Sequence, residues 1–495
     1  MIKESVSLKK NVLITLSTMG QFPEMYKLAE QLKKSEHFNP IMYFNLSVYG
    51  TSVRLAQVCL NNGLDILDYT QGFFQAQKIA VTDVSASSAP NIQAPKQVRS
   101  GLVSQFKYLI KTKFPAVFQI LKSIVLYVQG SMGLLGFFYR VYEKLSRKKK
   151  EKTYIDTLKI KLMIFAEDSE DYHTPQLIRL GRDSQIKSVV FPYTYANQFE
   201  FLEDAFFNNR HVNKNFLCWV TGYLFPKWTF DYKGKKILKS APYLILSAEL
   251  FKHSPENPWV MNSGSADSIA VESQFMKSYF GAVGIPLEKM IVTGYPSLDH
   301  LFEIIQNKAS YRIRLSEVSG LDTRKRWVVC AVPPSQWPRA GVGFKTYEQF
   351  LQEFINFFRQ MTDVEVLFKF HPRIGEAAAQ KTCDQLGIKY FSQDTVELIG
   401  MSDMYVATVS STMRWALALG LPTINYDMYD YNYGDFSLAK NYYTVVTFAD
   451  FKNIYKKLIS TENTESVQED YACLDGRSNE RVLKLFSDLT QSNNR

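Results

Sequence analysis

Short apolar runs alternate with longer helix-like segments between residues 366 and 427, and this alternation constrains the fold more than any other feature of the sequence. The runs VLFKF, MYVATV and PTINY are five or six residues long, which suits strands buried on both faces. The segments between them are long enough for a helical crossover. We therefore predict a parallel, doubly wound α/β sheet in this region.

Polar residues follow the predicted strands at the ends where doubly wound sheets bind ligands. They are Ser335 after RWVVCAVPP, His371, Pro372 and Arg373 after VLFKF, Asp394 and Glu397 after YFSQ, and Ser410, Ser411 and Thr412 after MYVATV. Taken alone, each group is more often a helix cap or a surface turn than a ligand site. Their convergence on one sheet edge favours a ligand site, and hydroxyls that open a helix suit a phosphate.

The N-terminal part of the chain shows the same alternation, beginning with NVLITLS and PIMYFN. Strand, helix, strand is the opening of a Rossmann-like domain, but the sequence lacks G-x-G-x-x-G there, so a dinucleotide is not predicted. Farther on, the strand LMIFA is followed by Glu167, Asp168, Glu170 and Asp171. A helix dipole explains one or two acidic residues at such a place, and a base for deprotonating a hydroxyl is the other interpretation.

Two stretches of the chain resemble bacterial GT-B glycosyltransferases. One is a strand followed by HPR and then, about forty residues later, by strand–SST–helix and Gly-Leu-Pro; the other is residues 266–299, which end in GYPSLD. The first is similar to enzymes that build capsules, lipopolysaccharide and teichoic acid, including sialyl- and Kdo-transferases with His-Pro and Ser-Ser motifs. The second is similar to these transferases and also to sugar-nucleotide 2-epimerases.

The resemblance implies the GT-B fold, an α/β architecture of two Rossmann-like domains with a cleft between them. The expected parts are an acceptor domain at 1–310 with a basic and apolar insertion at about 72–155, a nucleotide-sugar domain at 311–475, and a helix at 476–495 that crosses back. Within the first domain, YLILSA at 243–248 is expected to be a late strand.

The resemblance also implies an activity, namely inverting transfer of a sugar from a nucleotide-sugar donor to a glycan acceptor in bacterial cell-surface polysaccharide synthesis. It favours a CMP-activated ulosonic acid slightly over a UDP-sugar. Asp168 is the expected base, Glu167 is the alternative, and His371 stabilises the leaving nucleotide. The residues expected to bind the donor are Pro372, Arg373, Asp394, Glu397, Ser410, Ser411, Thr412 and Ser335.

No metal and no cofactor are expected beyond the donor itself. The sequence contains no Asp-x-Asp, and adjacent carboxylates are what an enzyme needs to hold a diphosphate through a divalent ion. Helix N–H groups and His371 could carry the phosphate charge instead. We therefore predict a metal-independent reaction.

The net charge of +10 is concentrated in one segment. Residues 99–153 hold nine Lys and three Arg against two Glu, which accounts for the whole net charge. The same segment is apolar and aromatic, with an uncharged run of 17 residues at 123–139 that is short for a membrane-spanning helix. We predict an element that rests on an anionic membrane surface, and a pair of core-packed helices with a solvated basic tail is the alternative.

The remaining composition excludes several classes of protein. Five widely spaced cysteines without a C-x-x-C pair argue against a zinc or disulfide framework and suit a reducing compartment. With no signal-peptide pattern, we expect a cytoplasmic protein on the inner face of the cell membrane. Because the charge is local and no nucleic-acid-binding motif is present, nucleic acid is not an expected partner.

Two rival functions fit the same patterns. A sugar-nucleotide 2-epimerase or hydrolase would share GYPSLD and the serine helix, and it would consume a sugar nucleotide without an acceptor. A non-catalytic scaffold of polysaccharide assembly would bind a nucleotide without turnover. The sequence leaves both open.

Overall fold

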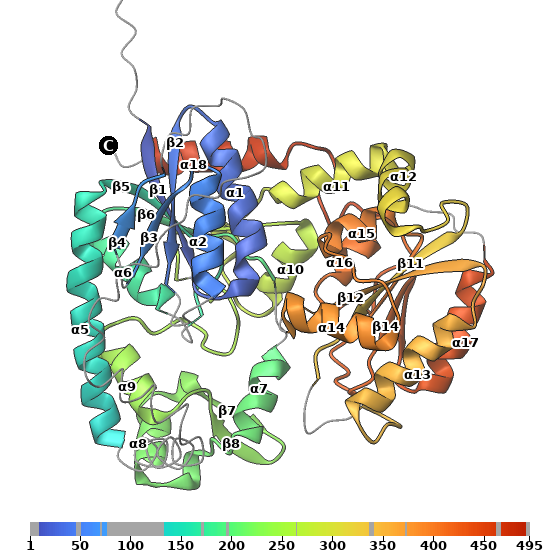
Figure 1. Cartoon of the computed structure of the whole chain (residues 1–495). Coiled ribbons are helices and arrows are strands. Elements are labelled where there is room, and N and C mark those ends of the chain that lie inside the picture. Colours follow the sequence, from blue (N-terminus) through green and yellow to red (C-terminus); the bar gives the residue numbers. More distant parts are fainter. Residues whose placement is uncertain are drawn as a thin grey trace, which may run out of the picture.

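Two parallel β-sheets, each with flanking helices, make up most of the protein (Figure 1). The computed structural model describes residues 9–45, 51–69, 72–76, 133–169, 173–194, 198–263, 265–335, 341–371, 374–461 and 467–491. The strands of the first sheet are β1 (Lys10–Leu16), β2 (Phe38–Phe44), β3 (Asp65–Asp68), β4 (Gly72–Phe74), β5 (Ile160–Phe165), β6 (Lys187–Val190), β9 (Ser268–Val271) and β10 (Met290–Val292). Their order is β10-β9-β6-β5-β1-β2-β3-β4, and only the pairing of β3 with β4 is antiparallel.

The second sheet has five strands in the order β12-β11-β13-β14-β15, all parallel. They are β11 (Arg326–Val332), β12 (Val364–Phe370), β13 (Met404–Ala407), β14 (Thr423–Tyr426) and β15 (Tyr442–Val445). An order in which β11 lies between β12 and β13 places a topological switch point there. The predicted α/β chain with two Rossmann-like sheets is confirmed.

Helices connect the strands of both sheets. In chain order they are α1 (Phe22–Lys34), α2 (Thr51–Asn61), α5 (Gly133–Thr157), α6 (Thr174–Asp183), α7 (Gln198–Phe207), α8 (Phe216–Leu224), α9 (Pro242–Leu250), α10 (Gln274–Ala282), α11 (Pro296–Gln306), α12 (Lys308–Ser319), α13 (Tyr347–Arg359), α14 (Glu376–Leu386), α15 (Thr395–Met401), α16 (Met413–Ala418), α17 (Phe448–Ile459) and α18 (Ser478–Gln491). Short 3₁₀ turns lie at η1 (Met19–Gln21), η2 (Val212–Lys214), η3 (Pro226–Trp228) and η4 (Leu287–Lys289).

Alternation along β11 shows how the second sheet separates two cores. Trp327 and Val329 belong to the larger core, which continues into the first sheet. Val328, Cys330 and Val332 belong to a second core filled by phenylalanines of α13 and by α17. Successive side chains of a strand point to opposite faces, so a strand buried on both sides needs apolar residues throughout. This is why RWVVCAV reads as a continuous apolar run.

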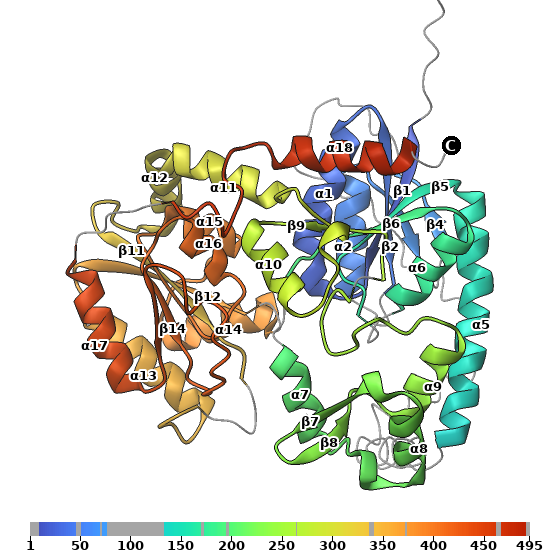
Figure 2. The ribbon, with the colours of Figure 1, turned by 180° about the vertical axis from the view of Figure 1, so that it is seen from behind.

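The C-terminal helix α18 packs on the first sheet although it follows the second in the chain (Figure 2). Asp299 accepts hydrogen bonds from the backbone N–H groups of Ser478 and Asn479, both at 2.8 Å. Gly294 has a φ of +72°, and a Cβ there would lie 2.1 Å from the Ser478 hydroxyl. Gly294 and Asp299, the first and last residues of GYPSLD, therefore position α18, because both contact the start of that helix.

A small third unit lies below the first sheet in Figure 1 and consists of α7, α8, α9 and the hairpin of β7 (Thr229–Tyr232) and β8 (Lys235–Leu238). Its core includes the fully buried Trp228. The expected strand YLILSA is wrong, because these residues form α9, which begins at Pro242. Pro at the first helical turn favours a helix, and a short apolar run alone does not separate strand from helix.

Much of the expected insertion at 72–155 lies outside the described residues, but its C-terminal part is the helix α5. Arg147 pairs with Glu151 at 3.0 Å and stacks on the Tyr69 ring, while the Lys150 ammonium donates to the Tyr69 carbonyl. Both members of the Arg147–Glu151 pair are buried. This part of the basic segment is therefore packed against the first sheet. Among the helices that the structure describes, none is long and apolar enough to cross a membrane.

The first sheet with its helices is called the first unit below, and the second sheet with its helices the second unit. A buried ion pair joins the two. Glu272, which follows β9, accepts from Arg414 Nε and from Trp415 Nε1 of α16, both at 2.6 Å. Glu272 and Arg414 are 0% and 1% exposed. Burial raises the pKa of Glu272, and the Arg414 guanidinium opposes this rise. The pair holds the start of α16 against the first sheet.

Removing one member of this pair is expected to be costly. Arg414→Met leaves the Glu272 carboxylate buried without its guanidinium, and breaking such a pair typically costs about 3–5 kcal/mol of unfolding free energy. The double variant Glu272→Gln, Arg414→Met is expected to recover part of this loss. Denaturant unfolding measures both. Lys484→Met, which breaks an exposed pair with Asp488, is the control, and an Arg414→Met cost no larger than the control's would contradict the assignment.

Candidate functional site

The carboxyl ends of strands from both sheets meet in one region. The Thr194 hydroxyl, just past β6, lies 2.8 Å from the Ser411 hydroxyl, just past β13. Gly20, in the turn after β1, lies next to Tyr193, since a Cβ on Gly20 would be 3.7 Å from that ring. The loops that follow β1 and β6 therefore face the loop that opens α16. Ligands of doubly wound folds bind at such edges.

The loop between β13 and α16 is held in a strained conformation. Val409 has a φ of +40°, which is a genuine outlier for a β-branched residue. Its backbone N–H donates to Asn425 Oδ1 at 2.9 Å, and Asn425 belongs to the neighbouring strand β14. Strain of this kind persists only where surrounding contacts enforce it, and it clusters at functional sites.

The three predicted hydroxyl residues of this loop differ in their partners. The Thr412 hydroxyl lies 2.5 Å from the Tyr405 hydroxyl and 2.7 Å from the Ser410 hydroxyl. Thr412 also donates its backbone N–H to the Ser410 hydroxyl at 3.3 Å. The Ser411 hydroxyl contacts the first unit through the Thr194 hydroxyl. Thr412 therefore supports the loop, while Ser410 and Ser411 line the adjoining pocket.

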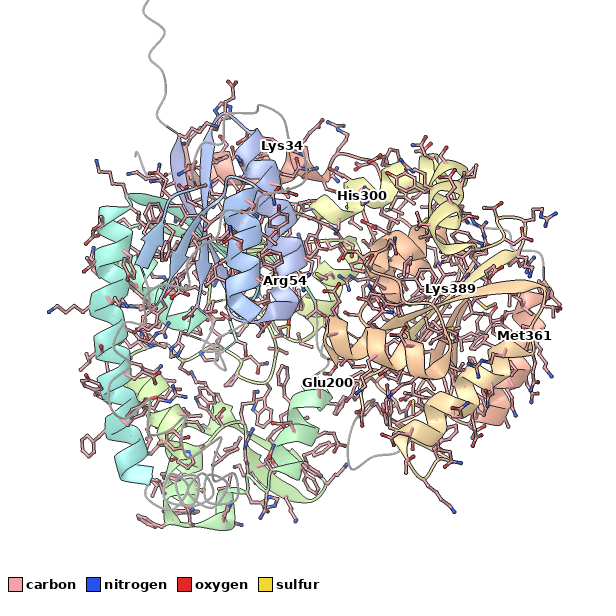
Figure 3. The ribbon with its side chains drawn as sticks, in the orientation of Figure 1. Lys34, Arg54, Glu200, His300, Met361 and Lys389 are labelled. Atoms are coloured by element: carbon pink, nitrogen blue, oxygen red, sulfur yellow. The ribbon has the colours of Figure 1, made fainter. Side chains whose placement is uncertain are left out.

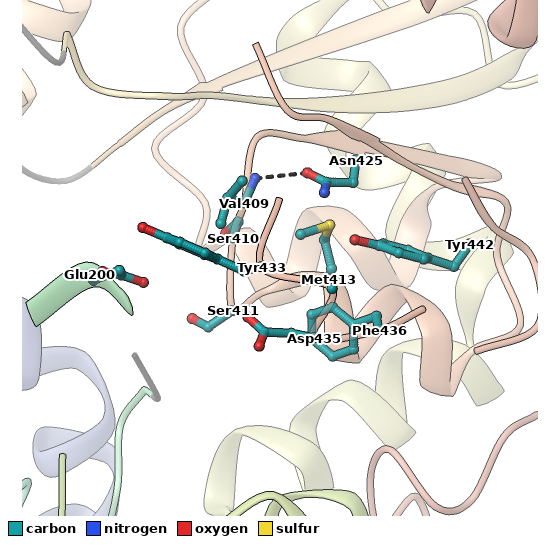
Figure 4. Close-up of a pocket in the computed structure, with 11 residues that line it drawn as sticks. Glu200, Val409, Ser410, Ser411, Met413, Asn425, Tyr433, Asp435, Phe436 and Tyr442 are labelled. Carbon is teal, nitrogen blue, oxygen red and sulfur yellow. Dashed lines mark hydrogen bonds between the residues drawn. The ribbon is translucent and has the colours of Figure 1, made fainter. Parts of the chain in front are cut away.

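That pocket is a hollow, open to solvent, beside Ser410 and Ser411 (Figure 4). Asn425, Tyr433, Asp435 and Tyr442 line it from the second unit, and Glu200 lines it from α7 of the small unit. Sequence reasoning missed all five of these residues. Two of them, Tyr433 and Asp435, lie in the aromatic and acidic stretch YDMYDYNYGDF, which begins at the end of β14 and is uninformative without the register of the strand.

The two candidate bases lie side by side in sequence but have different surroundings. Asp168 is completely buried, and its carboxylate accepts from Ser265 N at 2.8 Å and from the Ser263 hydroxyl at 3.5 Å. Burial raises the pKa of Asp168 to about 6, although these hydrogen bonds oppose the rise. Asp168 thus fastens the loop before β9 to the end of β5.

Glu167 instead points to the turn after β1. Its Oε1 accepts from Gln21 Nε2 at 2.6 Å, and Gln21 in turn accepts from the backbone N–H groups of Ser17 and Thr18. Glu167 is buried as well, at 2% exposure. Because this turn faces Tyr193, Glu167 is the acidic residue connected to the region between the sheets.

Asp394 and Glu397, both expected to bind the donor, contact the first unit. Asp394 pairs with Lys27 of α1 at 2.7 Å, and Glu397 Oε1 lies 3.2 Å from His300 Nε2 of α11. The pKa of His300 is raised, chiefly by the hydrogen bond with Glu397. Neither residue is among those that line the pocket at Ser410. Their observed contacts hold α15 against α1 and α11.

The other expected donor residues lie along the same edge of the second sheet. His371 follows β12, and its backbone N–H donates to the Val332 carbonyl at 3.2 Å. Ser335 follows β11 and is exposed. Pro372 and Arg373 lie outside the described residues. Within the part of the chain that the structure describes, no group of three or more His, Cys, Asp or Glu side chains is arranged to hold a metal ion.

Comparisons with known proteins give structural similarity at low sequence identity. No family model matches the chain, and no curated protein matches it by sequence. A UDP-N-acetylglucosamine 2-epimerase from Neisseria meningitidis bound to UDP-GlcNAc is similar over 97% of this chain and 100% of its own, with 10% identity and a TM-score of 0.48. A putative UDP-N-acetylglucosamine 2-epimerase from Listeria monocytogenes is similar over 99% of this chain and 98% of its own, with 11% identity and a TM-score of 0.49. The wall teichoic acid polymerase TagF is similar over 98% of this chain and 90% of its own, with 10% identity and a TM-score of 0.47.

Asp168 is expected to make stability depend on pH. Its folded pKa lies above its unfolded value, so the folded state binds the proton more tightly, and the favourable contribution is lost as pH rises from about 4 through about 6. Asp168→Asn keeps the shape of the neutral acid and removes this loss. Relative to the variant, the wild type should therefore lose about 3 kcal/mol of unfolding free energy between pH 4 and pH 8. Urea unfolding across this range measures the difference, and a pH-independent difference would contradict the burial argument.

Proposed function

We propose that this protein is a GT-B enzyme that transfers a sugar from a nucleotide-sugar donor to a glycan acceptor, with inversion at the anomeric carbon. The observation that carries the proposal is the strained loop Val409–Thr412, which faces Thr194 across the gap between the two sheets. The loop presents hydroxyls, and it stands at the sheet edge where phosphates bind. A site built from both units suits a reaction between two substrates.

In the proposed reaction the donor phosphate binds Ser410 and Ser411, and His371 stabilises the negative charge that develops on the leaving nucleotide. The acceptor hydroxyl loses its proton to a carboxylate. Its oxygen attacks the anomeric carbon from the face opposite the phosphate, and the bond from that carbon to the phosphate oxygen breaks. The products are the glycoside and the nucleotide, and in this proposal neither a metal nor a further cofactor takes part.

Glu167 is the base that the contacts favour over Asp168. Both oxygens of Asp168 accept hydrogen bonds from the loop at 263–265, whereas Glu167 Oε1 accepts from Gln21, in the turn after β1 that faces Tyr193. In the proposed complex an acceptor hydroxyl takes the place of Gln21 Nε2 at Glu167 Oε1. A base has to come within hydrogen-bond reach of the proton it takes, and apo structures often show such groups bonded elsewhere.

Replacing both Ser410 and Ser411 by Ala should weaken nucleotide binding and leave the fold intact. Each hydrogen bond to a charged group contributes about 1.5–3 kcal/mol at most. Calorimetric titration with UDP, CMP and CDP, in EDTA and again with Mg²⁺, measures the loss and tests metal independence. Thr461→Ala, on the surface at the end of α17, is the control. Equal affinity of the double variant and the wild type would remove this site from the proposal.

Glu167→Gln should lower turnover by about 10²–10⁴-fold while donor binding is retained, since a positioned base contributes that much to rate. Asp168→Asn is the matched control, because it removes the adjacent carboxylate, and its rate should stay within a few-fold of wild type. The measurement is steady-state transfer at saturating donor, with and without acceptor. Consumption of a nucleotide sugar that needs no acceptor would support the epimerase or hydrolase alternative, and binding without turnover would support the scaffold.

We also propose that the enzyme acts in the cytoplasm, on the inner face of the cell membrane, where lipid-linked glycan acceptors are presented. Aromatic side chains on the outside of α8 support this, because Phe216, Trp219 and Tyr223 stack in a row and are at least half exposed. Tyr139 and Tyr142 are exposed on α5, which packs against the same small unit (Figure 1). Aromatic residues beside lysines anchor proteins at anionic surfaces.

Trp219→Ser combined with Tyr223→Ser should release the protein from vesicles that contain phosphatidylserine. Each buried aromatic side chain is worth about 1.5–3 kcal/mol, so the partition constant should fall at least tenfold. Sedimentation with such vesicles measures it. Leu438→Ser, at an exposed apolar residue of the second unit, is the matched control. Wild-type protein that does not sediment with these vesicles would refute the membrane proposal.

A further inference from the structure

A side chain of the neighbouring strand holds the backbone of Val409 in its left-handed conformation. Asn425 Oδ1 accepts the Val409 N–H at 2.9 Å, as the dashed line in Figure 4 shows. The φ of +40° is unfavourable for valine, because in this conformation the Cβ crowds the following carbonyl oxygen. The hydrogen bond to Asn425 therefore opposes a rotation that would relieve the strain at Val409.

Asn425 is itself firmly placed on β14. It pairs with Ala407 of β13 on one side and with Thr444 of β15 on the other. A backbone N–H can bond only the oxygen of an amide, so the contact with Val409 settles which way the Asn425 side chain is turned. Burial raises the pKa of Tyr442, and hydrogen bonds with Thr444 and Asn425 oppose this rise. The Asn425 amide thus has contacts on two sides, to Val409 and to Tyr442.

The conformation of Val409 decides where the next residues point. Rotation about a backbone bond turns the chain that follows it, and here Ser410 and Ser411 follow. Asn425, Val409 and both serines line the same pocket. The bond between Asn425 and Val409 therefore determines how the two serines are presented to that pocket.

We propose that Asn425 is a positioning residue for nucleotide binding, because it holds Val409 in the conformation that presents Ser410 and Ser411 to the donor phosphate. The inference rests on the proposed function, which assigns the phosphate to these two serines. Asn425 acts through Val409 rather than on the nucleotide itself. When only a fraction of the molecules holds the binding conformation, the apparent affinity falls by that fraction. Loss of the Asn425 oxygen should therefore appear as weaker nucleotide binding.

A second hydrogen bond between the same two segments provides the matched control. The Thr408 hydroxyl donates to the Tyr426 carbonyl at 2.8 Å. Thr408→Val removes this bond and keeps the size and branching of the side chain. Because both bonds join the end of β13 to β14, their losses should lower the free energy of unfolding by similar amounts. Only the loss of the Asn425 bond releases Val409.

The test is calorimetric titration of the whole protein with UDP, CMP and CDP. Asn425→Leu keeps the size of the side chain and removes its oxygen, and it should weaken nucleotide binding by about tenfold or more. Asn425→Ala, at a side chain beside an open pocket, is measured in parallel with the same expectation. Thr408→Val should stay within about twofold of the wild type. Urea unfolding of every variant gives its loss of stability for comparison.

A rescue variant separates positioning from direct contact. Glycine adopts a positive φ without strain, so Val409→Gly should make the loop less dependent on Asn425. Added to Asn425→Leu, it should recover affinity by about threefold or more, and this gain should exceed its effect on the protein that retains Asn425. Such coupling is expected only if Asn425 acts through the backbone of Val409.

Wild-type nucleotide affinity in Asn425→Leu would overturn the inference and leave the proposed function standing. So would equal losses in Asn425→Leu and Thr408→Val, which indicate a general loosening of the sheet edge. A loss that Val409→Gly does not repair would also overturn it, since Asn425 would then contact the nucleotide directly. If the wild type binds none of the three nucleotides, or the variant with both Ser410 and Ser411 replaced binds as the wild type does, the proposed function fails and the inference with it.

Discussion

The contact of Glu272 with Arg414 and Trp415 is the interaction on which the arrangement of the two sheets depends. It connects the end of β9 in the first sheet to the first turn of α16 in the second, in a place closed to solvent. Arg414 also donates to the Ser411 carbonyl at 2.5 Å. The same guanidinium thus binds the first unit and shapes the loop with the strained Val409. Bringing the sheets together and shaping the loop Val409–Thr412 are therefore coupled, because both use the Arg414 side chain.

The sequence was sufficient to predict the two parallel sheets, while ligand binding at their carboxyl edge stays a prediction. A strand that is apolar throughout, such as RWVVCAV, can be recognised locally, and so can hydroxyls that open a helix. Partners across long separations were not predictable. Asp394 and Glu397 have the residue types of a ligand site, yet Lys27 and His300 lie far from them in sequence. That Glu200 and Asp435 line one pocket could not be predicted for the same reason, since only the folded chain brings α7 close to the segment after β14.

GYPSLD shows how a motif can suggest chemistry and serve architecture. Its resemblance to sugar-nucleotide enzymes indicated a family and gave no role to its individual residues. In the structure Gly294 leaves room for Ser478, and Asp299 accepts the first N–H groups of α18. A side chain on Gly294 would collide with the hydroxyl of Ser478, and a carboxylate is favourable at a helix N-terminus. The motif therefore specifies how the last helix is attached.

This attachment also bears on the order of folding during synthesis. All strands of the first sheet are complete by Val292, but α18, which packs on that sheet, is made only after the whole of the second unit. Domains generally fold as units while the ribosome is still working, with the N-terminal one first. Here the first sheet leaves the ribosome before α18 has been made. The apolar surface that α18 covers therefore stays exposed while the second sheet is translated. The growing chain is therefore most exposed to aggregation and to chaperone binding during this interval, which ends when α18 docks.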